Sequence, residues 1–137
     1  MMKAFHNGTV IKGSNLIVSV IPQDTSSLSG TLDEFASQRN IDSVLLKAIL
    51  QKLGFNQTQY EKNMQEYSAG QKKKVYIAAS LCDKAHLYIW DEPLNYIDIY
   101  SRRQIEKLII SYQPTMLLVE HDKAFQDAVA TQIITIE

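Results

Sequence analysis

Several residue types that mark particular protein classes are scarce in this chain. Its 137 residues include one cysteine, Cys82, together with five glycines and three prolines. A single cysteine excludes an internal disulfide framework and suits a reducing compartment. No apolar run approaches the roughly 20 residues that a membrane helix needs, and a net charge of −1 offers no global basic field for nucleic acid. We therefore predict a soluble, cytoplasmic protein that does not insert into a membrane.

The first part of the chain predicts one strand followed by helices. Residues 15–22 are rich in β-branched residues and stop at a proline, as a strand would. Thr31 and Glu34 have the spacing of a capping box. Residues 43–53 carry apolar side chains at helical spacing and end at Gly54, a common helix stop. We expect residues 31 to about 82 to be mostly helical.

The second part predicts alternating strands and helices. Residues 86–90 and 115–119 are short, nearly continuous apolar runs, which suit strands buried on both faces of a parallel sheet. Residues 101–112 open with a serine–glutamine capping pair, and residues 132–136 form a last apolar run. The order β-α-β-α-β indicates an α/β fold, whose chemistry is expected at the carboxyl ends of its strands.

A helix start at residues 68–71 has two interpretations. Ser68 and Gln71 have capping-box spacing, so the stretch can be an ordinary capped amphipathic helix. A helix N-terminus also offers free N–H groups and a positive dipole end to a phosphate. Ser68 would add a hydroxyl there, and Gly70 would let an oxyanion approach the backbone. Residues 72–74, all lysines, are interpreted as a solvated helix face.

Polar residues follow each predicted strand. Asp91 and Glu92 come directly after residues 86–90, either as solvated loop acids or as functional carboxylates. In the functional interpretation Asp91 orients water on a magnesium ion, and Glu92 polarises the water that attacks a γ-phosphate. His121 is either structural or exposed, or it donates a hydrogen bond to a phosphate oxygen. Gln23 could reach a metal or a water, and one cysteine without a close histidine pair argues against zinc.

In this order the motifs resemble those of the ATP-binding-cassette (ABC) ATPases. "YSAGQKKK" resembles their signature motif, and "LYIWDEP" resembles their Walker B strand with its catalytic glutamate. "LNYID" is similar to their D-loop, "IPQD" to their Q-loop, and His121 falls where the switch histidine does. The resemblance covers nearly the whole chain, from about Gly8 onward.

Finer features resemble the ABC-F group, soluble proteins with two cassettes in one chain that act on the ribosome. "EPLNYID" and "EHDKAF" match the motif versions typical of that group. The combined motifs look most like the second cassette of its antibiotic-resistance branch, whose members dislodge ribosome-targeting drugs. Four positions depart from the usual pattern, with other residues more common there: Tyr67, Ala69, Leu94 and Tyr96.

The resemblance implies an ATPase whose two cassettes close around two ATP molecules with Mg²⁺. A second cassette is therefore the expected partner, with the ribosome contacted through parts outside this sequence. The residues implied to serve the γ-phosphate held by the other cassette are Ser68, Gly70 and Gln71. Those implied to serve a nucleotide held by this cassette are Gln23, Asp91, Glu92 and His121, and the D-loop residues are Asn95 and Asp98.

A phosphate-binding loop with the pattern G-x-x-x-x-G-K-[ST] is the missing part of that resemblance. Residues 8–14 contain two glycines, but Ser14 stands in the place of the lysine and a predicted strand follows. We therefore expect a partial cassette that lacks the P-loop strand and does not hydrolyse ATP alone. Its expected parts are a strand with the Q-loop (1–24), a helical signature subdomain (25–83) and a Walker B, D-loop and switch-histidine core (84–137).

Two other interpretations remain open from the sequence. The chain could belong to the nucleotide-binding domain of a membrane transporter, although its D-loop and switch-histidine motifs argue against that class. It could also be a non-catalytic remnant or interaction module that pairs with an intact cassette. The resemblance further implies that the P-loop strand would lie between residues 115–119 and 132–136, so we expect copies of this chain to associate through that edge.

Overall fold

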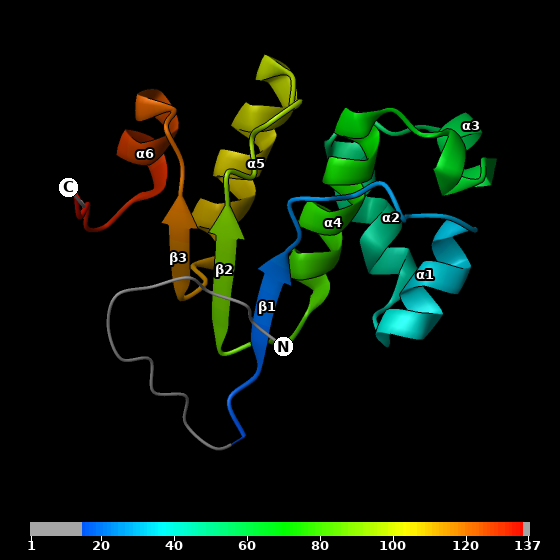
Figure 1. Cartoon of the computed structure of the whole chain (residues 1–137), viewed down its shortest axis with the longest axis horizontal. Coiled ribbons are helices and arrows are strands. Elements are labelled where there is room, and N and C mark those ends of the chain that lie inside the picture. Colours follow the sequence, from blue (N-terminus) through cyan, green and yellow to red (C-terminus); the bar gives the residue numbers. More distant parts are fainter. Residues whose placement is uncertain (1–14, 136–137) are drawn as a thin grey trace.

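A three-stranded parallel sheet forms one side of the molecule. The structure is a computed structural model, and it describes residues 15–135. Its strands are β1 (Val18–Ile21), β2 (Leu87–Asp91) and β3 (Met116–Val119). They lie side by side in the order β1-β2-β3, all pointing the same way (Figure 1). The predicted α/β fold with a parallel sheet is confirmed.

The register of the sheet brings the three strand ends to one edge. Ile21 of β1 pairs with Trp90 of β2, and Asp91 of β2 pairs with Val119 of β3. The residues that follow the strands therefore leave the sheet at nearly the same level. This alignment is what places separate sequence motifs near one another.

The segment between β1 and β2 is helical, as predicted. It contains α1 (Leu32–Arg39), α2 (Ser43–Lys52), α3 (Gln57–Glu61), a 3-10 turn (Met64–Glu66) and α4 (Ala69–Cys82). The helices α1 to α3 lie away from the sheet, and α4 connects them to it (Figure 1). The reciprocal Thr31–Glu34 capping box forms at the start of α1, and Gly54 after α2 has a φ of 95° that favours glycine.

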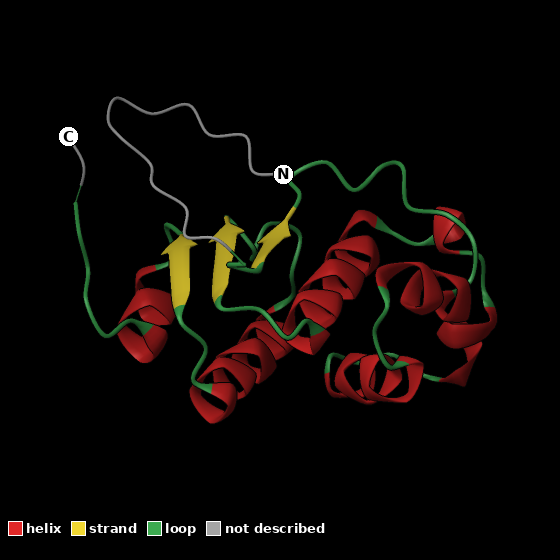
Figure 2. Cartoon of the chain, turned by 90° about the horizontal axis from the view of Figure 1, so that it is seen from below, coloured by secondary structure: helices red, strands yellow, loops and turns green. Residues whose placement is uncertain are grey.

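The helices cover one face of the sheet. α5 (Ile99–Tyr112) connects β2 to β3, and α6 (Lys123–Val129) follows β3. Figure 2 shows the helices next to the sheet, α4 to α6, on the same side of the three strands. On the other face Leu117 and Val119 of β3 are 56% and 46% exposed. The prediction that these strands are buried on both faces was wrong for β3, because no described helix covers its outer side.

A chain of polar contacts beside the apolar core joins the sheet to the helical segment. Trp90 is fully buried, and its indole N–H donates to Ser80 of α4 at 2.8 Å. The Ser80 hydroxyl lies 2.6 Å from that of Ser19 in β1. Ser19 donates in turn to Asp83, which pairs with Arg39 of α1 at 2.7 Å. Because buried polar groups need partners, this chain of contacts fixes α4 against the sheet.

One predicted boundary, the start of α5, differs from the structure. α5 begins after Asp98, whose carboxylate accepts from the Ser101 N–H, so Ser101 is not the cap and does not form the predicted pair with Gln104. The Ser101 hydroxyl instead donates to Asp98 at 2.8 Å, and its oxygen lies 3.2 Å from the Leu53 carbonyl oxygen. Asp98 is the N-cap in place of Ser101 because a carboxylate at this position accepts a charge-assisted hydrogen bond.

The prediction of a last strand at 132–136 is wrong for its described residues, 132–135. Residues 132–135 form no strand, and Ile133 and Ile134 are 57% and 74% exposed. A strand needs a neighbour to complete its backbone hydrogen bonds, and this run pairs with none in the described part of the chain. The glycine-containing stretch 8–14 lies outside the described residues. Within residues 15–135, no helix is long and apolar enough to cross a membrane.

Candidate functional site

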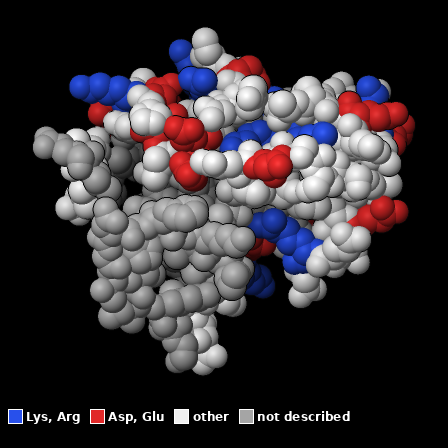
Figure 3. Space-filling view, viewed as in Figure 1, with Lys and Arg blue, Asp and Glu red and all other residues white. Residues whose placement is uncertain are grey.

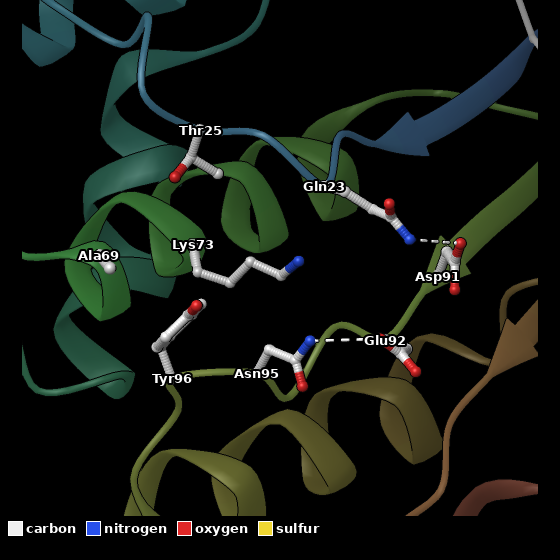
Figure 4. A pocket seen from close by; sticks show the side chains of 8 residues that line it. All are labelled: Gln23, Thr25, Ala69, Lys73, Asp91, Glu92, Asn95 and Tyr96. Atoms are coloured by element: carbon white, nitrogen blue, oxygen red, sulfur yellow. Dashed lines mark hydrogen bonds between the residues drawn. The ribbon is translucent and has the colours of Figure 1, made fainter.

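Side chains from separate parts of the chain surround one cavity at the carboxyl edge of the sheet. The cavity has a volume of about 200 Å³. Its walls come from the loop after β1, the start of α4, the end of β2 and the segment before α5 (Figure 4). The lining residues are Gln23, Thr25, Ala69, Lys73, Asp91, Glu92, Asn95 and Tyr96.

Gln23 and Asp91 meet at the ends of neighbouring strands. The Gln23 side-chain amide donates to the Asp91 carboxylate at 2.8 Å (Figure 4). This contact leaves the amide oxygen of Gln23 and the second carboxylate oxygen of Asp91 available. Mg²⁺ prefers oxygen ligands and is often held by one or two carboxylates together with waters and phosphate oxygens. The donor set therefore fits a hydrated Mg²⁺ at Gln23 and Asp91.

A protein-only metal centre is not present in the part of the chain that is described. Residues 15–135 contain no group of three His, Cys, Asp or Glu side chains arranged to hold an ion. The pair Gln23–Asp91 supplies too few ligands for a closed site. A magnesium ion here would need the oxygens of a phosphate and of water, which fits a metal that arrives with a nucleotide.

Glu92 is held from both sides of its carboxylate. One oxygen, Oε1, lies 2.9 Å from Nε2 of His121, and the other, Oε2, accepts from the Asn95 side-chain amide at 3.3 Å. The backbone of Glu92 has a φ of 48°, and its N–H donates to the Val119 carbonyl at 2.7 Å. A left-handed backbone at a non-glycine residue is sparsely populated. These contacts fix a carboxylate that can accept a proton from a nearby water.

Ser68 and Gln71 form the predicted capping box at the start of α4. The Gln71 N–H donates to the Ser68 hydroxyl oxygen at 3.1 Å, and the Ser68 N–H donates to the Gln71 side-chain oxygen at 2.9 Å. The helix interpretation of this stretch is therefore confirmed. It does not exclude the phosphate interpretation, because Ser68 is exposed at the helix N-terminus.

Gly70 has a packing reason that the sequence did not reveal. A Cβ added at this position would lie 2.5 Å from the backbone carbonyl oxygen of Tyr96. Real Cβ atoms do not approach a backbone oxygen so closely. Glycine is therefore what lets the signature helix contact the segment between β2 and α5.

The lysine run at the start of α4 does not form the predicted solvated face. Lys73 is only 4% exposed, and its side chain points into the cavity toward Asp91 and Glu92 (Figure 4). Burial lowers its pKa, and the negative charges of Asp91, Glu120 and Glu92 act against that shift. The helical spacing of Lys73 with the buried Ile77 and Ser80 is the signal that could have found it.

Asp98 does not line the cavity. Its carboxylate caps α5 and pairs with Lys74 of α4 at 2.9 Å. Burial alone would raise the pKa of Asp98, but hydrogen bonds from Lys74 and Ser101 outweigh it and hold the pKa well below its usual value. Asp98 thus joins the two helices that flank the site.

Charge of neither sign dominates the visible surface. Figure 3 shows acidic and basic side chains interspersed over the described part of this face. A large basic patch would be expected for a protein that binds nucleic acid through its own surface. The described part of this face shows no such patch.

Comparisons with known proteins fit the arrangement of these motifs. The chain is 34% identical to "Probable ATP-binding protein YheS" of Escherichia coli (strain K12) over 66% of this chain and 14% of that protein. It is 28% identical to "ATP-binding protein Uup" of Caulobacter vibrioides over 95% of this chain and 23% of that protein. The chain thus spans less than a quarter of the length of either relative.

A solved structure has the same fold. The chain superposes with a TM-score of 0.70 and 29% identity on a chain from the complex of archaeal ribosomal stalk protein aP1 and archaeal ribosome recycling factor aABCE1. That match covers 90% of this chain and 25% of the other. The family model described as "ABC transporter" matches residues 3–95. Since this match covers more than half of the sequence, the chain belongs to the ABC transporter family, as part of its ATPase domain.

Proposed function

We propose that this chain supplies the Q-loop, signature, Walker B, D-loop and switch-histidine elements of a cassette that binds and hydrolyses Mg²⁺-ATP. One observation carries the proposal: Glu92 is held between His121 and Asn95 beside the cavity that Asp91 lines. A carboxylate fixed in this way can act as a general base, while the residues around it can contact phosphate and metal.

The proposed roles follow the positions of the side chains. Glu92 accepts a proton from the water that attacks the γ-phosphate, and His121 orients Glu92 and donates to a phosphate oxygen. Asp91 and Gln23 hold the hydrated Mg²⁺, which when bound neutralises charge on the phosphates. Asn95 keeps the second oxygen of Glu92 in place through the contact of 3.3 Å.

The signature residues serve a second nucleotide in this proposal. Ser68, Gly70 and Gln71 lie at the N-terminal end of α4, where N–H groups and the helix dipole favour an anion. They would contact the γ-phosphate of an ATP held by another cassette, which is the proposed partner. Asn95 and Asp98 belong to the D-loop, which lies beside the signature helix through the contact of Gly70 with Tyr96.

The wider role is also proposed. Support comes from the motif versions in 92–98 and 120–125, and from relatives named as ATP-binding proteins. One structural neighbour is described as an archaeal ribosome recycling factor. We infer that the intact protein is a cytoplasmic ABC-F ATPase of the antibiotic-resistance type that acts on the ribosome. In it, residues 1–24, 25–83 and 84–137 serve as the Q-loop strand, the signature subdomain and the catalytic core of the second cassette.

The test of catalysis is Glu92→Gln in a polypeptide that joins this sequence to a phosphate-binding loop. The substitution keeps the shape of the side chain and removes the base, so ATP binding should persist while single-site turnover falls at least about a hundredfold. Glu66→Gln is the matched control, because Glu66 is exposed and outside the cavity. Undiminished turnover at this site would remove Glu92 from the mechanism.

A further inference from the structure

Arg102 lies in the first turn of α5, outside the cavity, and contacts two segments that carry site residues. We propose that Arg102 is a positioning residue that fastens the segment 94–97 to the turn 120–122, and so sets where His121 stands relative to Glu92. This inference rests on the proposed function for its catalytic consequence. The mechanical link itself depends only on the contacts around Arg102.

The Arg102 guanidinium reaches three acceptors at once. Its Nε donates to the Ile97 carbonyl at 3.0 Å, and its Nη2 lies 3.5 Å from the Leu94 carbonyl. Its Nη1 donates to the Asp122 carboxylate at 2.8 Å. The planar guanidinium can hold acceptors in several directions, and the single ammonium of a lysine cannot reproduce this geometry.

Asp122 extends the link from Arg102 into the core. Its Oδ2 accepts from Arg102, and its Oδ1 accepts from the Phe125 N–H at 3.0 Å, which caps α6. The Phe125 side chain is 1% exposed and belongs to the apolar core. Arg102 is thereby joined to a part of the structure that is firmly packed.

Glu120 connects the same two segments a second time. Its Oε2 lies 3.4 Å from the Leu94 N–H, and its Oε1 accepts from the N–H groups of His121 and Asp122. Leu94 is therefore held through its N–H by Glu120 and through its carbonyl by Arg102. His121 lies between Glu120, which contacts Leu94 directly, and Asp122, which is joined to the segment 94–97 through Arg102.

This arrangement has a consequence for the site. Asn95 belongs to the segment 94–97 and Glu92 lies just before it, whereas His121 belongs to the turn 120–122. His121 has a side chain that is 84% exposed, so packing around its ring does little to hold it. Its position therefore depends on its contact with Glu92 and on its backbone, which the contacts of Glu120, and of Arg102 with Asp122, hold in place.

The mechanical part is tested on this chain without nucleotide. Arg102→Met should speed amide hydrogen exchange at both 94–97 and 121–125, with little change in α2. Arg103→Met is the matched control, because Arg103 is the exposed neighbour in the same helix. Arg102→Lys should restore little of the protection, since lysine cannot hold all three acceptors.

Two exchange results would overturn the link. One is faster exchange in only one of the two segments, and the other is an equal increase throughout the molecule, which would indicate a general stabilising role. A double-mutant cycle with Asp122→Asn adds a second test. If the two residues act as one unit, the effects of the single changes should be clearly non-additive; additive effects would count against it.

The catalytic part is tested in a polypeptide that includes a phosphate-binding loop. Arg102→Met should lower kcat by about tenfold or more while KM changes little, because the change misplaces reacting groups. An increase in KM with kcat unchanged would reject the positioning role. If the unsubstituted polypeptide hydrolyses no ATP, the proposed function fails, whereas the exchange experiment still decides whether Arg102 joins the two segments.

Discussion

The Nε2 atom of His121 and the Oε1 atom of Glu92 lie 2.9 Å apart. The two residues leave neighbouring parallel strands, β2 and β3, whose register places Asp91 opposite Val119. Neither strand alone would orient either side chain. The parallel pairing and the backbone bond from Glu92 to Val119 together produce this contact at the edge of the cavity.

Replacing His121 with alanine should impair catalysis and leave the fold intact. Its side chain is 84% exposed, so little buried surface is lost, and the thermal midpoint should shift by less than about 2 °C. ATP turnover in a polypeptide with a phosphate-binding loop should fall by about tenfold to a hundredfold, since Glu92 loses one of its two partners. Calorimetry checks the thermal midpoint, and single-turnover kinetics check the rate of ATP turnover. A large loss of stability with normal turnover would contradict this role.

Gly70→Ala should destabilise the contact between α4 and the segment before α5. In an unconstrained helix the change would stabilise by about 0.5–1 kcal/mol. Here the new Cβ would lie 2.5 Å from the Tyr96 carbonyl oxygen, and overpacking of this kind costs about 1–3 kcal/mol. Denaturant unfolding of this chain should therefore show a net loss, while the neighbouring Ala69→Ser should have little effect. A net gain for Gly70→Ala would mean that the two segments do not touch closely.

Much of the fold could be predicted because local patterns and tertiary contacts agree. The apolar runs became β2 and β3, and the capping boxes at Thr31 and Ser68 formed as expected. The sequence could not reveal which cap would win at α5, because Asp98 and Ser101 both suit that role. The run 132–136 failed as a strand over its described residues because an apolar pattern does not supply a pairing partner.

The site was predictable to a similar degree and for a related reason. Gln23, Asp91 and Glu92 follow strands, and parallel strand ends converge on one edge, so their meeting could be foreseen. Lys73 was missed because a lysine run suggests solvent. The packing role of Gly70 depends on Tyr96, which is distant in sequence, and therefore required the folded structure.

Lys73→Met should stabilise the chain. Lys73 is 4% exposed, and because burial lowers its pKa, the folded state disfavours the ammonium charge. An apolar side chain of similar length avoids this cost. We expect a gain of about 1 kcal/mol. Lys72→Met is the control, because that neighbouring side chain is more exposed.

The same lysine should give a pH signature in the alkaline range. The folded-state pKa of Lys73 lies below its ordinary value of 10.5, so the unfolded chain binds the proton more tightly. The contribution of Lys73 to the free energy of unfolding should therefore rise with pH between its lowered pKa and 10.5. That rise should be smaller in Lys73→Met than in the unsubstituted chain. An unchanged slope, or a loss of stability in the variant, would show that the ammonium has a compensating partner.

Asp98 should contribute stability that is lost in acid. Its folded-state pKa is held below the ordinary 3.8, so its contribution is fully present above that value and disappears as pH falls through the folded pKa. Asp98→Asn retains a helix cap but loses the charge facing Lys74. The variant should lose about 0.5–1 kcal/mol at neutral pH and show a shallower acid dependence. Asp33→Asn, which removes the more exposed pair with Lys47, should change the acid profile less.

The free edge of β3 should cause this 137-residue chain to associate when it is purified alone. Among the described residues β3 pairs only with β2, and residues 132–135 form no strand that could pair with its other edge. Unpaired backbone groups beside exposed apolar side chains favour pairing with another chain, and Leu117 and Val119 are both exposed. Sedimentation should therefore show a concentration-dependent increase in mass, and Leu117→Lys should suppress it, since a charge on an edge strand opposes pairing. Val44→Lys supplies the matched control, because Val44 is 74% exposed on α2, away from the sheet. A monomer at all concentrations, or equal suppression by both substitutions, would show that the β3 edge does not mediate association.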